Sequence, residues 1–352
     1  MPRDLRKPVE HLRAISKEGL GNAAAGAAWR KVAAAPPAAL PDLLASMDGA
    51  NDYALNWMRT AVEAVEQRAH AEARPLPVSK LEAFLKDTRH HPRARHLAFQ
   101  IIHRADSTAP ERLLPGLVND PSNDLRRDAV DRLVQLAATA AAQDKQQGID
   151  QYESALAHAR EADQIDAIAK RLADLGRKVD LQQVFGWVTR WQLVGPFDNT
   201  GGAGFNTAFP PESGFNLEAR FDGKKGPVRW TESTTPNEYG LVDFNKPFGS
   251  LKEVTGYAHA EFWASQARDA EIRLGCKNGW KVWVNGQLLF GRDEYHRNME
   301  IDQYRLPFQL KAGRNEILVK CCQNEQTEDW TKEWEFQLRI TDPQGSPIRP
   351  AR

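Results

Sequence analysis

The stretch AEIRLGCKNGWKVWVNGQLLF (residues 270–290) and the stretch YRLPFQLKAGRNEILVK (residues 304–320) decide the fold of the second half of the chain. Trp280, Val282 and Val284 alternate with Lys281, Trp283 and Asn285, and this period of two predicts a strand with one buried apolar face. Asn285-Gly286 predicts a type I′ hairpin turn, because both residues tolerate positive φ. The residues around Gly313 predict a second strand pair joined by a glycine turn. Antiparallel sheet follows from both patterns.

The composition changes near residue 180. Before it the 352-residue chain is rich in Ala, Leu and Arg, whereas eight of the ten tryptophans lie at or beyond Trp187. A chain of this length also exceeds the usual size of one hydrophobic core. We therefore expect two domains, residues 1–180 and residues 181–352.

The first domain contains three similar segments, which begin at Leu40, Leu81 and Leu113. Each predicts a short apolar helix, a polar turn and a longer amphipathic helix. Such hairpins bury their apolar stripes by stacking on one another, so an α-solenoid follows. The spacing of roughly 32 to 41 residues resembles HEAT repeats. A further helical pair, residues 149–159 and 163–175, is expected to close the solenoid at Gly176.

The charge balance and the distribution of apolar residues bear on two possible partners, nucleic acid and the membrane. Lys and Arg together number 47, as do Asp and Glu, so the formal net charge is zero and we expect no nucleic-acid partner. We also expect no membrane span, because the chain has no apolar run of about 18 residues. The first residues, Met1 to Asp4, lack the apolar region of a signal peptide. This leaves two expectations open, a cytoplasmic protein or an exported one whose signal peptide has been removed.

One segment resembles a known group of proteins. FGWVTRWQLVGPFDNTGGAGFNTAFPPE, residues 185–212, is similar to a segment of bacterial, mostly exported proteins that join HEAT-like repeats to a sandwich domain. GWKVWVNGQLLF and GRNEILVK resemble the jelly-roll sugar-binding domain of family 2 glycoside hydrolases, which belongs to the galactose-binding-like group. The resemblance implies an antiparallel β-sandwich for residues 181–352. Domains of this group bind sugars, contact proteins or act as spacers, so the ligand stays open.

The related pattern more often carries an Asp-Asp pair where this chain has Cys276 and Lys277. Without those carboxylates, the role that they would have toward a metal or a hydroxyl-rich ligand does not carry over. Calcium is a common structural ion in galactose-binding-like folds, but we find no closely spaced carboxylates that commit to it. We expect no cofactor and leave a structural calcium ion open.

Ligand-binding candidates come from the loops between strands. Aromatic faces stack on sugar rings, while amide, carboxylate and guanidinium groups pair with hydroxyls. Two of the candidates also have structural interpretations, since Trp280 is in register with the core and Arg297 could pair with Asp302. Trp334 is expected in the core. The candidates are Asn278, Trp280, Arg297, Asn324, Asp329 and Trp330.

Cysteine and histidine give no catalytic or metal motif. Cys276 and Cys321 fall on apolar strand faces and are expected to be buried; whether Cys276 forms a disulfide with Cys321 or Cys322 stays open. A histidine cluster lies in the helical region, where we expect solvated or capping roles. Its members are His90, His91, His96 and His103.

Three functions remain after these exclusions. We favour a non-catalytic adaptor, in which the helical repeats hold a protein and the sandwich binds a glycan or a second protein. The first alternative is a carbohydrate-active enzyme or accessory subunit with two carboxylates at an interdomain cleft. Its candidate acids are Asp293, Glu294, Glu325 and Asp329. The second alternative is a sandwich that only caps the solenoid. The oligomeric state stays open.

Overall fold

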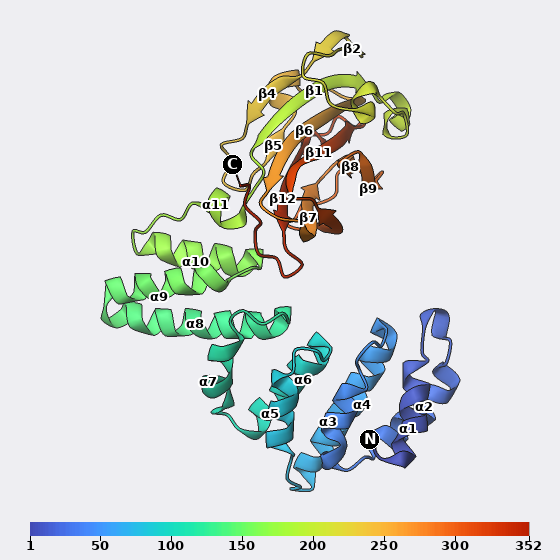
Figure 1. Cartoon of the computed structure of the whole chain (residues 1–352), viewed down its shortest axis with the longest axis vertical. Helices are drawn as coiled ribbons and strands as arrows, with labels where there is room; N and C mark the ends of the chain where they lie inside the picture. The colour runs from blue at the N-terminus through green and yellow to red at the C-terminus, as the bar shows by residue number, and fades with distance from the viewer. Residues whose placement is uncertain (352) are drawn as a thin grey trace. The chain divides into compact units, whose positions relative to one another are not determined.

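The computed structural model describes residues 1–351 and divides the chain into two compact units, one from Met1 to Leu175 and one that begins at Gly176. Helices build the first unit and antiparallel sheets build the second, as Figure 1 shows from the blue and green helices to the yellow and red strands. We call them the helical unit and the sheet unit. This order of helices and then antiparallel strands agrees with the sequence prediction.

The helical unit is a succession of short and longer helices with brief turns between them. Three 3₁₀ turns, Lys17–Gly19, Pro37–Ala39 and Leu114–Leu117, lie between the helices. The helices are α1 (Arg3–Arg13), α2 (Asn22–Ala33), α3 (Leu40–Ala45), α4 (Asp52–Ala71), α5 (Val78–Lys86), α6 (Pro92–Ala105), α7 (Ala109–Leu113), α8 (Asn123–Gln143), α9 (Lys145–His158) and α10 (Ala162–Asp174).

Two of the three predicted helical hairpins are confirmed as pairs of helices, namely α3 with α4 and α5 with α6. In the third segment the predicted short helix is the 3₁₀ turn Leu114–Leu117, and the longer helix α8 follows it. Leu44 and Leu85 from the short helices and Val65 and Ile101 from the long ones are buried in one core. The period of 3.6 residues therefore places the apolar stripes where the helices pack together.

Polar side chains define where these helices begin. The side chain of Asn51 accepts a hydrogen bond of 3.0 Å from the backbone N–H of Ala54 at the start of α4. His91 does the same for Arg93 at the start of α6, at 3.2 Å, which confirms a capping role for this histidine. Within residues 1–351, no group of three or more His, Cys, Asp or Glu side chains is arranged to hold a metal ion.

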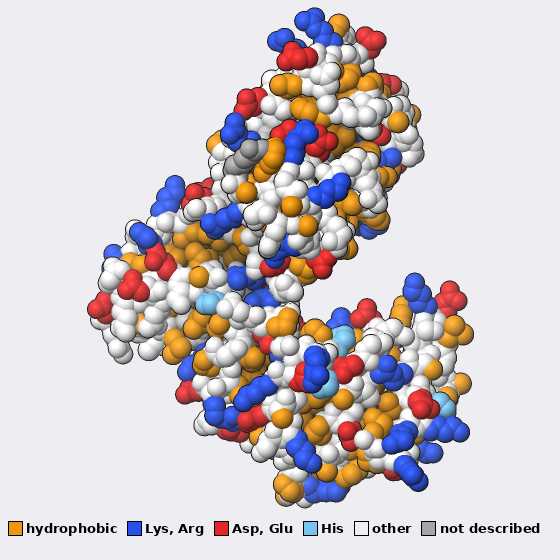
Figure 2. All heavy atoms as spheres, in the orientation of Figure 1, with side chains coloured by type: hydrophobic (Ala, Val, Ile, Leu, Met, Phe, Trp, Pro, Cys, Tyr) orange, Lys and Arg blue, Asp and Glu red, His pale blue; other side chains and the backbone are white. Residues whose placement is uncertain are grey.

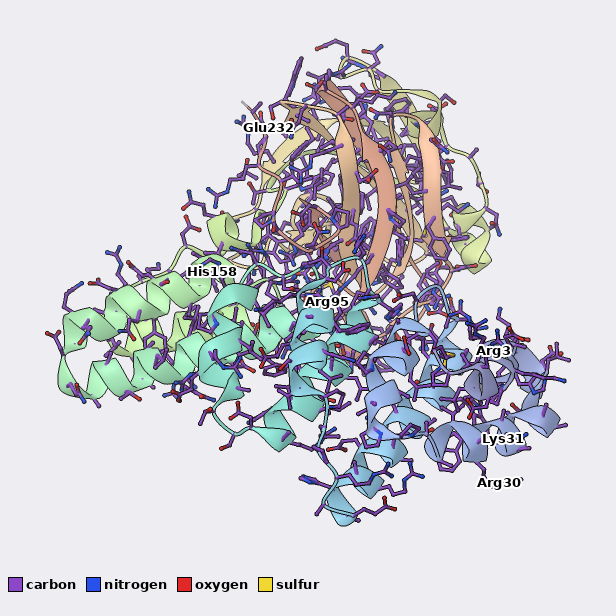
Figure 3. All side chains as sticks on the ribbon, turned by 60° about the horizontal axis from the view of Figure 1, so that its bottom comes forward. Arg3, Arg30, Lys31, Arg95, His158 and Glu232 are labelled. Carbon is purple, nitrogen blue, oxygen red and sulfur yellow. The ribbon has the colours of Figure 1, made fainter. Side chains whose placement is uncertain are left out.

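One buried ion pair holds α5, α6 and the turn before α8 together. Arg95 of α6, labelled in Figure 3, is 1% exposed and makes two hydrogen bonds to the carboxylate of Asp120, at 2.8 and 2.6 Å. Its Nε donates to the carbonyl of Leu85 at 2.8 Å. Both oxygens of Asp120 and three donors of Arg95 are satisfied, which is the condition for a buried charge pair to be tolerated.

The sheet unit contains two larger sheets and one ribbon of two strands. The six-stranded sheet has the order β4-β1-β6-β11-β8-β9, the four-stranded sheet has the order β10-β7-β12-β5, and β2 pairs with β3. The strands are β1 (Arg190–Asp198), β2 (Arg220–Gly223), β3 (Gly226–Arg229), β4 (Thr231–Thr234), β5 (Val242–Asp243), β6 (Val254–Ala264), β7 (Arg268–Cys276), β8 (Gly279–Val284), β9 (Gln287–Arg292), β10 (Tyr304–Leu310), β11 (Gly313–Gln323) and β12 (Glu335–Thr341). Short helical segments are α11 (Leu181–Phe185), α12 (Asn245–Phe248), and the 3₁₀ turns Thr200–Phe205, Pro210–Ser213 and Asp329–Thr331.

The predicted hairpin at Asn285-Gly286 is confirmed. Val284 of β8 faces Gln287 of β9, and the two turn residues have φ values of 52° and 77°. Positive φ at both central residues is the requirement of a type I′ turn, which Asn-Gly meets with little strain.

The second predicted strand pair is wrong. β10 pairs with β7 in the four-stranded sheet, whereas β11 pairs with β6 and β8 in the six-stranded sheet. The glycine turn before β11 therefore carries the chain from one sheet to the other. Asn315 holds this corner, since its side chain donates to the carbonyls of Lys311 and Gly313, at 2.8 and 3.1 Å. Alternation alone does not distinguish a hairpin from a crossing between sheets, because both place the apolar residues on the buried side.

The main core of the sheet unit lies between the two larger sheets, which both contribute to one cluster of buried side chains. Trp334 has no exposed surface, as predicted. Cys276 of β7 and Cys321 of β11 are also buried there as free thiols, at 2% and 0% exposure.

A connection between β1 and β4, residues 199–230, covers part of the outer face of the six-stranded sheet. Its aromatic residues join a second cluster that includes Tyr257 and Trp230. Lys320 of β11 is completely buried under this connection. Its Nζ donates to the carbonyl of Thr207 at 2.7 Å and to the carboxylate of Glu212 at 2.8 Å. The lysine thus ties the connection to the sheet through a satisfied buried charge.

A charged network binds α11 to the four-stranded sheet. Asp302 accepts hydrogen bonds from Arg273 at 2.8 Å and from Arg339 Nε at 2.7 Å. Arg339 also donates to the carbonyl of Phe185 at 3.2 Å, and its guanidinium lies 5.4 Å from the centre of that ring. The alternative pairing of Arg297 with Asp302 is wrong, because these two buried arginines take both carboxylate oxygens of Asp302.

The surface shows no region of one charge sign on the face drawn in Figure 2, where basic and acidic side chains are interspersed. None of the helices within residues 1–351 has the length and apolarity that crossing a membrane requires.

Candidate functional site

A cleft opens in the sheet unit where β1 and β6 separate. Their registered pairs end at Gln192 and His259. Before β1 begins, the chain lies against the other sheet, since the backbone N–H of Val188 donates to the carbonyl of Leu338 in β12 at 3.0 Å. β6 instead continues along β11 as far as Ala264. The resulting cleft has a volume of about 510 Å³, which lies in the range of small-molecule sites.

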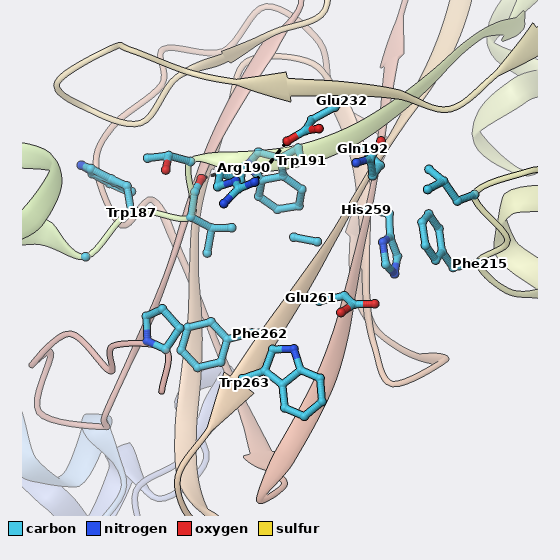
Figure 4. Close-up of a pocket in the computed structure, with 16 residues that line it drawn as sticks. Trp187, Arg190, Trp191, Gln192, Phe215, Glu232, His259, Glu261, Phe262 and Trp263 are labelled. Atoms are coloured by element: carbon cyan, nitrogen blue, oxygen red, sulfur yellow. Dashed lines mark hydrogen bonds and ion pairs between the residues drawn. The ribbon is translucent and has the colours of Figure 1, made fainter. Parts of the chain in front are cut away.

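Aromatic and polar side chains line this cleft together. Figure 4 shows Phe215 and His259 facing each other on one side, with Trp263 and Phe262 below them. The lining residues are Gly186, Trp187, Val188, Thr189, Arg190, Trp191, Gln192, Phe215, Leu217, Glu232, His259, Ala260, Glu261, Phe262, Trp263 and Pro350.

Strand register brings the polar groups of the cleft side by side. Glu232 of β4 faces Gln192 of β1, and Gln192 in turn faces His259 of β6. Neighbours in adjacent strands point to the same face of the sheet, and successive residues point to opposite faces. Glu261 and Trp263 follow at intervals of two along β6, so they share the face of His259.

His259 carries a hydrogen-bonding atom that no other group within residues 1–351 uses. Its ring stacks on Phe215 with 3.6 Å between centroids and 3° between planes. The side chain is only 3% exposed, and its Nε2 is buried without a hydrogen-bond partner in the described part of the chain. Burial lowers the pKa of His259 to about 4, so the imidazole is neutral at pH 7. A neutral imidazole has one donor and one acceptor nitrogen.

The two carboxylates of the cleft are each paired with an arginine. Glu261 lies 2.7 Å from the Nη2 of Arg314, and this hydrogen-bonded pair lowers the pKa of Glu261. Glu232 lies 3.2 Å from Arg190, as the dashed line in Figure 4 marks. The charged residues that line the cleft are Arg190, Glu232 and Glu261, and their formal charges sum to one negative unit. Arg314 is not counted, because it does not line the cleft. An acidic ligand is therefore disfavoured by charge.

Two of the sequence-predicted site residues are buried. Asn278 donates to the carbonyl of Glu333 at 3.1 Å and accepts from the backbone N–H of Glu335 at 3.3 Å. Trp280 lies between the sheets with its ring centroid 4.7 Å from that of Tyr304. Each is 1% exposed, so neither side chain reaches solvent in this arrangement.

The other four candidates lie on loops. Asn324 and Trp330 are brought together through His296, whose Nε2 is 2.7 Å from Asn324 Oδ1 and whose ring meets Trp330 edge to face. Trp330 is 61% exposed. Arg297 pairs with Glu294 at 3.2 Å and Asp329 pairs with Lys332, both at the surface. The binding role of these loop residues stays a prediction.

The proposed acids of an enzyme lie apart from the cleft between β1 and β6, since none of them lines it. Asp293, Glu325 and Asp329 are exposed, and Glu294 is half-buried beside Arg292 and Arg297. Paired or fully hydrated carboxylates of this kind are common on protein surfaces.

The residues that line the cleft were not among the site residues predicted from the sequence. Gln192, Phe215, Glu232 and His259 come from three strands and one loop, and only the sheet register makes them neighbours. One signal was present in the sequence, because the outer face of β6 carries His259, Glu261 and Trp263 at intervals of two. A polar and aromatic outer face on a central strand indicates an uncovered surface.

No protein-family model matches the chain, and no curated protein matches its sequence. Solved structures resemble it weakly. A family 2 β-galacturonidase from Eisenbergiella tayi has a TM-score of 0.28 and 10% identity over 43% of this chain and 23% of its own. An FMN-binding β-glucuronidase from Facaelibacterium prausnitzii has a TM-score of 0.25 and 16% identity over 43% of this chain and 21% of its own. The PA14 sugar-binding domain of an RTX adhesin has a TM-score of 0.23 and 14% identity over 44% of this chain and 89% of its own.

The chain spans less than a quarter of the two enzymes. At these TM-scores the similarity assigns neither a ligand nor an activity. A proposal for the function therefore rests on the side chains that line the cleft.

Proposed function

We propose that the sheet unit is a non-catalytic, galactose-binding-like β-sandwich of the jelly-roll type, and that it binds a neutral carbohydrate in the cleft between β1 and β6. The observation that carries this proposal is the unpartnered Nε2 of His259, buried in a cleft that also presents aromatic rings. Aromatic faces pack against the C–H faces of sugar rings, while amide and imidazole groups hydrogen-bond to hydroxyls. Trp263 and Phe215 supply the first kind of contact, and Gln192 and His259 supply the second.

The charges of the cleft favour a neutral sugar. Arg190 is engaged by Glu232, and Glu261 adds a further negative charge at the wall. A uronic or sialic acid would place its carboxylate beside these groups without a free cation. A neutral sugar meets no such repulsion.

The same charges favour binding over hydrolysis. A general acid needs a pKa near the working pH, so that it holds a proton to donate. The pairing of Glu261 with Arg314 has the opposite effect, because it lowers the pKa of Glu261 and keeps the carboxylate ionised. Glu261 is therefore suited to accept hydrogen bonds from hydroxyl groups.

We assign the helical unit a scaffold role as a HEAT-like α-solenoid. A polar groove of about 620 Å³ runs across α4, α6 and the start of α8, and it contains charges of both signs. Arg93 pairs there with Asp52 at 3.0 Å, and His96 lies 3.0 Å from Asp128 beside the groove. Such a mixed polar surface suits a protein partner, which would make the whole chain an adaptor.

A glycan array tests the proposal with the full chain and two tryptophan variants. Trp263→Ala removes a half-buried ring from the cleft, whereas Trp330→Ala removes an exposed ring from a loop outside it. We expect binding to neutral glycans that weakens by about tenfold or more in Trp263→Ala, as the loss of one stacked ring implies. Trp330→Ala should bind as the unchanged chain does.

Two other outcomes would contradict this assignment. Loss of binding in Trp330→Ala alone would place the site on the loop of Asn324 and Trp330, where the sequence analysis put it. Absence of glycan binding by the folded full chain would refute carbohydrate recognition and leave the helical groove as the surface to study. Gln192→Ala provides a second cleft variant that removes a hydrogen-bonding group without removing a large ring.

A further inference from the structure

Two buried thiols from opposite sheets meet in the core of the sheet unit. Cys276 is the last residue of β7 in the four-stranded sheet, and Cys321 lies in β11 of the six-stranded sheet. Their sulfur atoms are 3.7 Å apart, and 45 positions separate them in sequence. The two residues therefore touch across the interface between the sheets.

The neighbourhood holds both thiols in this position. Cys276 faces Phe336 of β12 through strand pairing, and Cys321 faces Trp280 of β8 in the same way. The turn after Cys276 is fixed by Asn278, which bonds to the backbone of Glu333 and Glu335. Each sulfur is anchored by a paired strand, so their contact is a consequence of the sheet packing.

We propose that Cys276 and Cys321 form a disulfide that links the two sheets when the chain folds in an oxidising environment. A disulfide has a sulfur–sulfur distance of about 2.05 Å, so the sulfurs must approach by less than 2 Å. The oxidant is a small disulfide such as oxidised glutathione. One cysteine thiolate attacks it and releases one reduced thiol; the second cysteine then attacks the mixed disulfide and releases another. Two protons and two electrons leave the protein, and two reduced thiols form.

Burial determines when this reaction takes place. The thiolate is the attacking species, and burial together with the neighbouring Cys276 raises the pKa of Cys321 well above its usual value. Both residues are at most 2% exposed, so a dissolved oxidant cannot reach them in the folded protein. The disulfide must therefore form before the two sheets pack against each other. Whether Cys276 and Cys321 form a disulfide therefore depends on whether the chain folds in an oxidising or a reducing environment.

The third cysteine provides a matched control. Cys322 follows Cys321 directly and points to the opposite face of β11, because successive side chains of a strand alternate. Its sulfur accepts a hydrogen bond of 3.4 Å from the hydroxyl of Thr255. Cys322 should stay a thiol under conditions that close the bridge.

Alkylation of the full chain after refolding tests the proposal. The chain is unfolded with reductant and refolded either with reductant or with a mixture of reduced and oxidised glutathione. It is then unfolded again, labelled with iodoacetamide and weighed. We expect three labels after reducing refolding and a single label, on Cys322, after oxidising refolding. Cys322→Ser should then carry none, whereas Cys276→Ser should keep a label on Cys321.

Two results would overturn the proposal. One is three labels on chains that refold to the native circular dichroism spectrum in the oxidising buffer. The other is a peptide map in which Cys322 takes part in the bridge. If the chain does not refold, export of the full chain to a bacterial periplasm replaces refolding, and the same peptide map of the soluble protein decides between Cys276–Cys321 and three free thiols.

Discussion

A neutral histidine at the end of the β1–β6 pairing combines burial with an unused hydrogen-bonding atom. His259 stacks on Phe215 and lies within 6.1 Å of the ring of Trp230, so aromatic groups surround it. Burial is the main reason that the pKa of His259 is lowered from 6.5 to about 4. The nearby charges of Glu261 and Arg314 act in opposite directions on this pKa. The same burial that keeps the ring neutral makes its protonation costly for the folded state.

This depressed pKa predicts a loss of stability in mild acid. Between pH 6.5 and pH 4 the unfolded chain binds a proton at His259 that the folded chain does not, so the free energy of unfolding falls as the pH falls. The shift of about 2.5 units corresponds to roughly 3 kcal/mol at pH 4. Between pH 6.5 and pH 4, the free energy of unfolding of His259→Gln should therefore fall by roughly 3 kcal/mol less than that of the unchanged chain. Urea unfolding of both proteins across pH 4 to 7 measures the difference, and parallel pH profiles would contradict the assignment.

Single aromatic residues show what sequence alone can and cannot place. Trp334 and Trp280 follow the apolar register of their strands, and both are buried as the alternation predicts. Trp263 also lies in a strand, on the face that carries His259 and Glu261. That polar and aromatic face indicates an uncovered surface, but it does not reveal that a cleft opens there. The cleft depends on where β1 leaves β6, which is a long-range property of the sheet. This is why the site predicted from sequence was confined to loops.

At the scale of elements, turn chemistry was predictable and sheet membership was not. Asn285-Gly286 encodes its own hairpin, because the two residues supply the backbone conformation that the turn needs. The turn after Leu310 has an equally clear glycine at Gly313, yet it connects different sheets. The helical pair predicted at residues 149–159 and 163–175 lies close to α9 and α10, because helix ends depend on local signals such as the cap that Asn51 forms at α4.

The network around Asp302 attaches the short helix α11 to the four-stranded sheet. Burial raises the pKa of this carboxyl, but Arg339 and Arg273 outweigh it and hold the pKa below its usual value. The carboxylate is therefore charged at neutral pH and compensates two guanidinium groups that are 0% and 2% exposed. A five-residue helix has little stability of its own, so α11 depends on this attachment.

Asp302→Asn should destabilise the sheet unit by about 3 to 5 kcal/mol, because it removes the carboxylate that two buried guanidinium groups share, and within residues 1–351 only Arg273 keeps another carboxylate partner, Glu271 at 3.0 Å. Amide hydrogen exchange should also become faster in α11. Asp329→Asn is the matched control, since the side chain of Asp329 is 94% exposed and pairs only with Lys332. We expect the control to change stability by less than about 0.5 kcal/mol. Equal stability of the two variants in urea would refute the role of Asp302.

At the scale of the whole molecule, each of the two units has a main hydrophobic core of its own within residues 1–351. One is formed by side chains between Leu5 and Ala129, and the other by side chains between Trp191 and Ile340. The boundary between Leu175 and Gly176 lies directly after α10, and Gly176 has a φ of 82°. Multidomain proteins of this kind commonly unfold in more than one step, because each core can be lost independently.

Calorimetry of the reduced and oxidised full chain tests whether the proposed disulfide stabilises the sheet unit alone. We expect two heat transitions, and only the transition of the sheet unit should rise on oxidation. Closing a loop of 45 residues restricts the unfolded chain and adds about 4 kcal/mol. For a unit of this size that gain corresponds to about 8 to 16 °C in Tm. Asp302→Asn identifies the transition, because it should lower the one that oxidation raises. A single transition that moves as a whole would mean that the two cores unfold together.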